Sequence, residues 1–273
     1  MEKTVLITGA TSGIGYSTAE LFLKHNWTVI ATGRNRNSLE KLSSLGAHTM
    51  ILDVTNEKDI DTVFNDIELK FSRLDVLVNN AGYGQFGSIE ETDDKSARKQ
   101  FDTNVFGLAA VTRRFLPLMR KYRTGRIINV SSIAGRISIP CGGWYAGSKH
   151  AVEAISDALR WEVKQFGIKV IVIQPGPIKT GFSTTVKNQM AVKSENSPYD
   201  EILKAVLNAG NKSSGGKVES CAKTIYKAAS SKRPKIRYIL TKEAWLIKII
   251  LFTLPQRLID NIIHRAIFKD KTN

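Results

Sequence analysis

Short apolar runs alternate with helix-length segments along most of this chain. Each run is almost continuously apolar and rich in β-branched residues, which is the pattern of a strand buried on both faces of its sheet. The runs expected to form strands are residues 4–8, 27–33, 48–52, 74–78, 126–131, 168–173 and 236–240. Strands of this kind separated by helices predict an α/β fold, with seven parallel strands in a doubly wound sheet covered by helices.

The segments between the runs are long enough for helices, which we expect at 13–25, 38–44, 57–71, 94–122, 143–166 and 218–230. A length of 273 residues is within the size that one such α/β unit reaches. We therefore expect residues 1–240 to form a single domain. Residues 241–273, which are apolar and then amphipathic, should form a helical extension packed on that domain.

A glycine-rich turn, Gly9-Ala-Thr-Ser-Gly13-Ile-Gly15, joins the first expected strand to the first helix. Glycines allow the backbone to approach a phosphate closely, and a helix N-terminus offers free N–H groups to an anion. The position of the turn between a strand and a helix predicts a dinucleotide site. The candidate contacts are Gly9, Thr11, Ser12, Gly13, Ile14 and Gly15.

The end of the second strand bears on which dinucleotide is bound. An acidic residue here would bind a free ribose 2′-hydroxyl, but Gly33 is followed by Arg34 and Arg36, with no carboxylate before Glu40. Arg34, with Arg36 as a lesser helper, favours the 2′-phosphate of NADP(H) over NAD. The alternative is that both arginines are simply solvated.

Other candidate cofactor contacts follow later strands, whose carboxyl ends converge on one edge of such a sheet. Asp53 could accept a hydrogen bond from an adenine amino group or cap the next turn. Amides after the fourth strand can brace the backbone, and the prolines after the sixth strand fix a turn. The candidates are Asp53, Val54, Asn80, Ala81, Gly82, Pro175, Gly176, Ile178 and Thr180.

Tyr145 and Lys149 are four residues apart on the helix expected at 143–166, so their side chains should share one face. A phenol has a pKa near roughly 10 and is a poor acid or base at neutral pH unless a nearby cation favours its ionised form. Ser132, thirteen residues before Tyr145, is placed to hold a carbonyl oxygen. Alone, the Tyr and Lys spacing could arise by chance.

Asn104 lies within the helix expected at 94–122, although asparagine is a weak helix former. It therefore either faces solvent or satisfies a specific partner. Because Phe101, Val105 and Phe106 flank it, we expect it to face inward.

Together, the glycine-rich turn, Asn79-Asn80-Ala81-Gly82, Asn104, Ser132, Tyr145-Ala-Gly-Ser-Lys149 and Pro175-Gly176 resemble the short-chain dehydrogenase/reductase family. The resemblance extends from the first strand to about residue 182. It implies a Rossmann fold and an NADP(H)-dependent oxidoreductase that usually forms homodimers or homotetramers through the tyrosine-bearing helix.

The same resemblance implies the catalytic roles. Tyr145 would be the general acid/base and Lys149 would bind the nicotinamide ribose and lower the pKa of the tyrosine. Ser132 would polarise the carbonyl, and Asn104 would support a proton relay through water. One departure is Ser12, where many NADP-using relatives carry a basic residue, so cofactor preference depends on Arg34.

The last third of the chain is less typical of the family. Residues 181–216 show no strong periodicity and form either a lid over the substrate or a poorly ordered insertion. The apolar run at 244–254 is too short to cross a bilayer. It could cover an apolar substrate pocket, lie in a membrane interface, contact a second subunit or pack on the domain's own core. The Leu-Pro-x-Arg-Leu pattern at 254–258, after an apolar helix, resembles the corresponding pattern of hydroxysteroid and retinol dehydrogenases and of acyl-dihydroxyacetone-phosphate reductases.

The net charge of +15 is concentrated in residues 201–273, which hold fifteen Lys and Arg against five Asp and Glu. No nucleic-acid-binding signature accompanies this charge, so we expect no nucleic-acid partner. Cys141 and Cys221 have neither metal-ligand nor disulfide-framework spacing, and no signal peptide pattern begins the chain. These features predict a protein of the reducing cytoplasm, with peripheral membrane contact as an alternative and no metal site.

The leading hypothesis is an NADP(H)-dependent enzyme that transfers hydride to or from a carbonyl or alcohol of a bulky apolar substrate. Steroid-like, retinoid-like and lipid-like molecules fit this description. One alternative is an acyl-dihydroxyacetone-phosphate-type lipid ketone reductase at a membrane surface. Another is a non-catalytic dinucleotide sensor.

Overall fold

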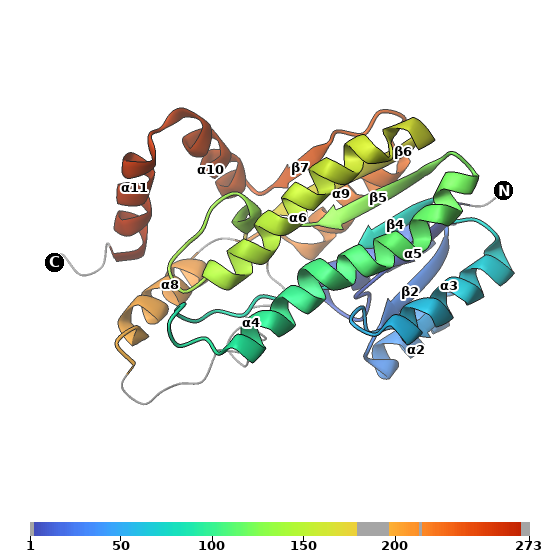
Figure 1. Cartoon of the computed structure of the whole chain (residues 1–273), viewed down its shortest axis with the longest axis horizontal. Helices are drawn as coiled ribbons and strands as arrows, with labels where there is room; N and C mark the ends of the chain where they lie inside the picture. Colours follow the sequence, from blue (N-terminus) through green and yellow to red (C-terminus); the bar gives the residue numbers. More distant parts are fainter. Residues whose placement is uncertain (1–2, 179–196, 213–214, 269–273) are drawn as a thin grey trace.

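The sheet is the centre of the fold, and helices cover both of its faces (Figure 1). The computed structural model describes residues 3–178, 197–212 and 215–268. Within these ranges the strands are β1 (Thr4–Ile7), β2 (Thr28–Gly33), β3 (His48–Ile51), β4 (Val76–Asn79), β5 (Gly125–Val130), β6 (Ile168–Pro175) and β7 (Arg237–Leu240). All pairs are parallel, in the order β3-β2-β1-β4-β5-β6-β7. The predicted seven-stranded, doubly wound α/β sheet is confirmed.

Alternation along each strand explains why the sheet is covered on both faces. In β1, Val5 and Ile7 point into one apolar core and Leu6 points into the other. The first core also holds side chains of α1 (Gly13–Lys24), α2 (Arg36–Ser44) and α9 (Val218–Ser230). The second holds side chains of α3 (Glu57–Phe71) and α5 (Leu108–Lys121), and Val163 at the end of α6 (Gly143–Glu162).

The long helix expected at 94–122 is divided into three parts. It begins as α4 (Asp94–Phe101), continues as a π-helical segment (Asp102–Gly107) and ends as α5. The expected helical stretch is therefore present, with a π-helical segment at its centre. Shorter 3₁₀ turns, Ile133–Gly135 and Lys164–Phe166, follow β5 and α6.

From β1, the strands β2 and β3 follow toward one edge of the sheet, and β4 to β7 follow toward the other edge. Ligands of such sheets bind in the crevice at this switch point, at the carboxyl ends of β1 and β4. In Figure 1, β5 points toward the end of the molecule where α8 (Asp200–Lys212), α10 (Lys242–Thr253) and α11 (Gln256–Phe268) lie. Part of the segment 181–216, which was expected to have no strong periodicity, forms the helix α8. Among the described helices, none combines the length and apolar character needed to cross a bilayer.

Candidate active site

The glycine-rich turn lies directly against the loop that follows β4. Gly9 has a φ of +64°, and a Cβ built there would lie 2.8 Å from the Cα of Ala81. A Cβ at Gly15 would lie 2.3 Å from the carbonyl oxygen of Gly9. Both contacts are with backbone, so only glycine fits at these two positions.

Asn80 ties the two loops together. Its Nδ2 donates to the carbonyl oxygens of Thr8 and Gly9, each at 3.0 Å. In return, the Thr8 hydroxyl accepts from the backbone N–H groups of Asn80 and Ala81, each at 3.1 Å. The predicted bracing role of this amide matches its hydrogen bonds.

The N-terminus of α1 suits an anion. The side chain of Ser12 makes no capping hydrogen bond, and the first turn of α1 contains no acidic residue. The first N–H groups of the helix, from Gly13 onward, are therefore available to an external acceptor. Ser12 is exposed, whereas Thr11, Gly13 and Ile14 are half-buried around the turn. These features fit the pyrophosphate of a dinucleotide.

Arg34 and Asp53 meet at the carboxyl ends of β2 and β3. The Arg34 NH1 group lies 3.5 Å from the Asp53 Oδ2 atom, and the Arg34 side chain is 71% exposed. Asp53 also accepts hydrogen bonds from the backbone and hydroxyl of Thr55 at 3.0 and 2.7 Å. Burial raises the pKa of Asp53, but the bonds from Thr55 and the charge of Arg34 outweigh it and lower the pKa overall. The neighbouring Val54 packs over the bare Cα of Gly107.

Asn104 faces inward, as expected, and lies in the π-helical segment. Its Oδ1 accepts from the N–H of Tyr83 at 3.0 Å, and its Nδ2 donates to the Tyr83 carbonyl at 2.9 Å and to the Ser148 hydroxyl at 3.0 Å. A Cβ at Gly82 would lie 2.9 Å from the Asn104 Oδ1 atom and 3.6 Å from the Lys149 Nζ atom. Asn104 therefore fixes the loop after β4 beside Lys149.

Ser132 and Tyr145 are brought together from the loop after β5 and the first turn of α6. A side-chain hydrogen bond joins the two residues. Ser132 is held in place because its Oγ accepts from the N–H of Ala134 at 3.1 Å, which caps the 3₁₀ turn. The Tyr145 ring also lies beside Phe86, with ring centroids 5.9 Å apart.

Lys149 lies on the same face of α6, and its Nζ is 6.0 Å from the centre of the Tyr145 ring. The ammonium donates to the carbonyl oxygen of Val130 at 2.9 Å. Burial lowers the pKa of Lys149 to about 8, and the charge of Glu153 opposes this effect. The lysine is thus a buried cation with a proton that it can lose near neutral pH.

The pKa of Tyr145 differs from the expectation. Burial raises the pKa of the phenol, and the hydrogen bond with Ser132 partly offsets this. This direction is opposite to the lowering that the neighbouring Lys149 was expected to cause. The Lys149 ammonium donates to the carbonyl oxygen of Val130, and the half-buried position of Tyr145 disfavours the ionised phenol.

Comparison with known proteins shows the family of the chain. The sequence profile described as "short chain dehydrogenase" matches residues 3–191. The chain belongs to the short-chain dehydrogenase/reductase family. A crystal structure of a short-chain dehydrogenase from Streptomyces avermitilis superposes with a TM-score of 0.82 at 31% identity, covering 100% of this chain and 98% of that one.

Curated relatives of this short-chain dehydrogenase also align over nearly their full lengths. The uncharacterized oxidoreductase YbbO of Escherichia coli is 35% identical, over 96% of this chain and 94% of the relative. The 3-ketodihydrosphingosine reductase of Bacteroides thetaiotaomicron is 35% identical, over 97% and 96%. The NADPH-dependent 3-dehydrocapnine reductase of Ornithobacterium rhinotracheale is 32% identical, over 98% of each.

The remaining candidates of this short-chain dehydrogenase follow β6. Pro175 ends the strand, and a Cβ at Gly176 would lie 2.3 Å from the Thr241 Oγ1 atom at the start of α10. Ile178 forms an isolated bridge with Gly216, whose N–H donates to Pro177 at 2.8 Å. Thr180 lies outside the described residues, as do positions 179–196 of the expected lid.

Several residues that support the site were missed in the sequence. Thr8 joins the two cofactor loops, and Ser148 holds Asn104. Asn79 was noted together with Asn80 in the sequence, but its bond to Asn129 at 2.9 Å on the adjacent strand end was not predicted. A polar residue at the end of an apolar strand was the available signal for both asparagines. Ser148 had no such signal, because a small hydroxyl in a helix is common.

Proposed function

We propose that this protein is an NADP(H)-dependent reductase of a lipid-like ketone, with Tyr145 as the general acid. The observation that carries the proposal is the half-buried Tyr145, whose side chain is hydrogen-bonded to Ser132 and lies one helical turn from Lys149. A sensor would need to bind a dinucleotide but would not need this arrangement.

Each residue has a separate part in the proposed reaction. Ser132 and Tyr145 would donate hydrogen bonds to the ketone oxygen, and Tyr145 would transfer its proton to that oxygen. Lys149 would hold the nicotinamide ribose, and Asn104 would position the loop at Gly82. The bound NADPH would supply the hydride. The turn from Gly9 to Gly15, with Asn80, Ala81 and the segment from Pro175 to Thr180, would hold the rest of the cofactor.

The substrate class is supported by two relatives. The full-length similarity to a 3-ketodihydrosphingosine reductase and to a 3-dehydrocapnine reductase favours a long-chain ketone over a steroid or a retinoid. The test follows NADPH absorbance with 3-ketodihydrosphingosine, a short-chain analogue of it, a steroid ketone and retinal. We expect turnover of the long-chain ketone at a kcat/KM at least about 100-fold above that of the short analogue. Tight NADPH binding without turnover of any compound would support the sensor instead.

Arg34 is proposed to select NADP(H) through the 2′-phosphate. Replacing it by Asp should lower the ratio of kcat/KM with NADPH to that with NADH by roughly 100-fold, because a charge-assisted hydrogen bond is lost and a like charge is introduced. Arg36→Asp, at the first residue of α2, is the matched control and should change the ratio less. Equal ratios in the wild type and in Arg34→Asp would mean that the phosphate is bound elsewhere.

Residues 181–216 are proposed to cover the substrate. The segment at 197–199 is joined to the loop before α4, because Ser197 donates to Glu91 at 2.7 Å and the Tyr199 hydroxyl donates to Glu90. This loop precedes α4 on the side of the site where Phe86 meets Tyr145. A cover anchored there would exclude water from an apolar ketone.

The C-terminal helices are proposed to contact a membrane surface that holds the substrate. Ala244 and Ile259 are buried, but Trp245 and Leu246 are 59% and 56% exposed on α10. The helix begins beside Gly176 at the site, at the end of the molecule opposite α2 and α3 (Figure 1). The excess of basic residues in 201–273 suits anionic head groups.

Vesicle flotation with the full-length protein tests this contact. Trp245→Gln with Leu246→Gln should reduce binding to vesicles of phosphatidylcholine and phosphatidylserine at least about tenfold, because apolar surface is removed. The control replaces Leu45 and Leu69, which are 53% and 83% exposed on the opposite side, by Gln and should bind like the wild type. Equal flotation of all three proteins would exclude this face as the contact.

We also propose a homodimer or homotetramer formed through α6. Trp161 on α6 and Phe106 beside α5 are both large apolar side chains exposed on the protomer, at 65% and 63%. Light scattering after size-exclusion chromatography measures the mass directly. A monomer at micromolar concentration would contradict the proposal.

A further inference from the structure

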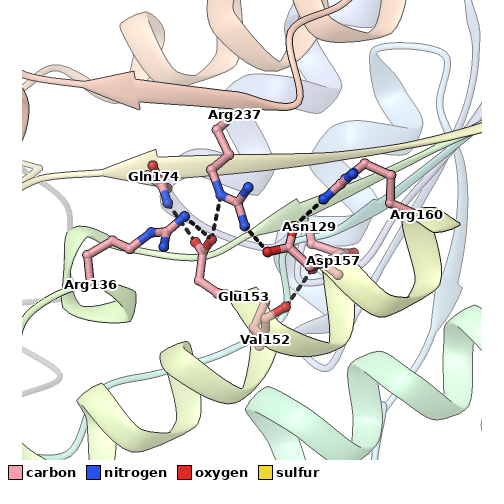
Figure 2. A network of polar contacts seen from close by, with 9 residues as sticks. Asn129, Arg136, Val152, Glu153, Asp157, Arg160, Gln174 and Arg237 are labelled. Atoms are coloured by element: carbon pink, nitrogen blue, oxygen red, sulfur yellow. Dashed lines mark hydrogen bonds and ion pairs between the residues drawn. The ribbon is translucent and has the colours of Figure 1, made fainter. Parts of the chain in front are cut away.

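Glu153 is a carboxylate in an unusual place, one helical turn beyond Lys149 on α6. It is only 5% exposed. Burying a carboxylate is costly unless it is paired and hydrogen-bonded, so its partners indicate what it is for. Figure 2 shows that three side chains from other segments converge on it.

The three partners come from three different parts of the chain. Gln174 donates to the Glu153 Oε1 atom at 2.9 Å, and Arg237 donates to its Oε2 atom at 2.9 Å. The Arg136 guanidinium lies 3.5 Å from Oε2. Gln174 directly precedes Pro175 in β6, Arg237 begins β7, and Arg136 follows the 3₁₀ turn that Ser132 caps.

The loop that bears Ser132 is packed directly on Glu153. A Cβ at Gly135 would lie 2.9 Å from the Glu153 Cγ atom and 3.0 Å from the Lys149 carbonyl oxygen. The same carboxylate therefore contacts the Ser132 loop, the Lys149 helix and the end of β6. These three segments all carry residues of the proposed active site.

Glu153 also acts on Lys149 through its charge. Burial lowers the pKa of Lys149, and Glu153 is the group that raises it again. The other charged groups of the network are Arg136 and Arg237, which face Glu153, and Asp157, which accepts from Arg237 and also from Arg160 at 2.8 Å. Arg237 thus forms ion pairs with two carboxylates, Glu153 and Asp157.

We propose that Glu153 is a positioning residue of the active site, which joins the Ser132 loop, α6 and β6 and holds a negative charge one helical turn from the Lys149 ammonium. Only the expected change in the pH profile of kcat/KM rests on the proposed reductase function. The geometry and the charge relation to Lys149 are properties of the protein itself.

The first test is Glu153→Gln, which keeps a side chain of nearly the same shape and an oxygen that can accept from Arg237. Removing the negative charge should move the alkaline limb of the kcat/KM profile for reduction from near pH 8 to lower pH by roughly one unit. Above that limb, activity should fall about tenfold relative to the wild type. The matched control is Asp157→Asn, which removes a charge from the same network one turn farther from Lys149 and should leave the limb in place.

For a second variant we expect the pH of the alkaline limb to shift in the opposite direction. Arg237→Gln removes a cation that faces Glu153, so the limb should move to higher pH. Titration of Lys149 by NMR of ¹³C-labelled lysine gives the same comparison without any turnover. If the wild type reduces no ketone but the NMR pKa shifts in these two directions, the reductase proposal fails and the role of Glu153 stands. The positioning role of Glu153 is refuted if Glu153→Gln leaves both the Lys149 pKa and the alkaline limb of the kcat/KM profile unchanged. It is also refuted if Glu153→Gln and Asp157→Asn shift them equally.

Discussion

Tyr145→Phe should lower kcat/KM for ketone reduction by roughly 100- to 10,000-fold, the range that general acid catalysis contributes. The variant removes one oxygen, which is hydrogen-bonded to Ser132. Because the pKa of Tyr145 is raised by burial, the wild-type phenol is protonated at neutral pH and can serve directly as the proton donor. The loss should appear in kcat, while NADPH binding measured by fluorescence should change little.

Tyr122→Phe is the matched control, since this tyrosine lies at the exposed end of α5 and its substitution removes the same atom. It should keep wild-type kinetics. A fully active Tyr145→Phe enzyme would show that the Tyr145 hydroxyl is not the proton donor. Lost activity together with lost NADPH binding would indicate a folding defect, which thermal unfolding would reveal.

The strands were predictable because a parallel strand that is buried on both faces needs apolar side chains at every position. In β1 the consecutive residues Val5, Leu6 and Ile7 alternate between the two cores, and all three are apolar. Most ends of the strands were predicted to within two residues, whereas α6 ends at Glu162, four residues before the expected end, and a 3₁₀ turn fills the interval before Gly167. The seven-stranded sheet and the family followed from this local information.

The π-helical segment could not be predicted, because its cause is tertiary. The apolar periodicity continues through residues 102–107, so a regular helix satisfies the local pattern equally well. Asn104 is drawn inward by Tyr83 and Ser148, which are distant in sequence. A widened turn lets its side chain reach both partners without breaking the helix.

The network around Glu153 was hidden for a similar reason. A glutamate in an amphipathic helix usually faces solvent, and nothing near it in the sequence indicates otherwise. Its partner Arg237 is 84 residues away and Gln174 is 21 residues away. Only the packing of β6 and β7 against α6 brings them together. The roles assigned to the site residues themselves stay predictions that the substitutions described here test.

Gly15→Ala should weaken NADPH binding by roughly 10- to 100-fold, because the added methyl group overpacks a site with no room for it. The new Cβ would lie 2.3 Å from the Gly9 carbonyl oxygen and 2.5 Å from the Asn80 Nδ2 atom. Relief of either contact moves the glycine-rich turn or disrupts the bonds from Asn80 to Thr8 and Gly9. Both changes alter the backbone that faces the phosphates. Isothermal titration calorimetry with NADPH measures the loss.

The control separates this effect from a general loss of stability. Gly46 has a φ of +96° and open space around its Cα, so Gly46→Ala strains the backbone without any collision. It should lower the free energy of unfolding by about 1 kcal/mol and leave NADPH affinity unchanged, since Gly46 lies in the turn before β3. If the two variants lost affinity equally, the weakened binding would reflect stability. If Gly15→Ala kept wild-type affinity, the turn would not be the place where the pyrophosphate binds.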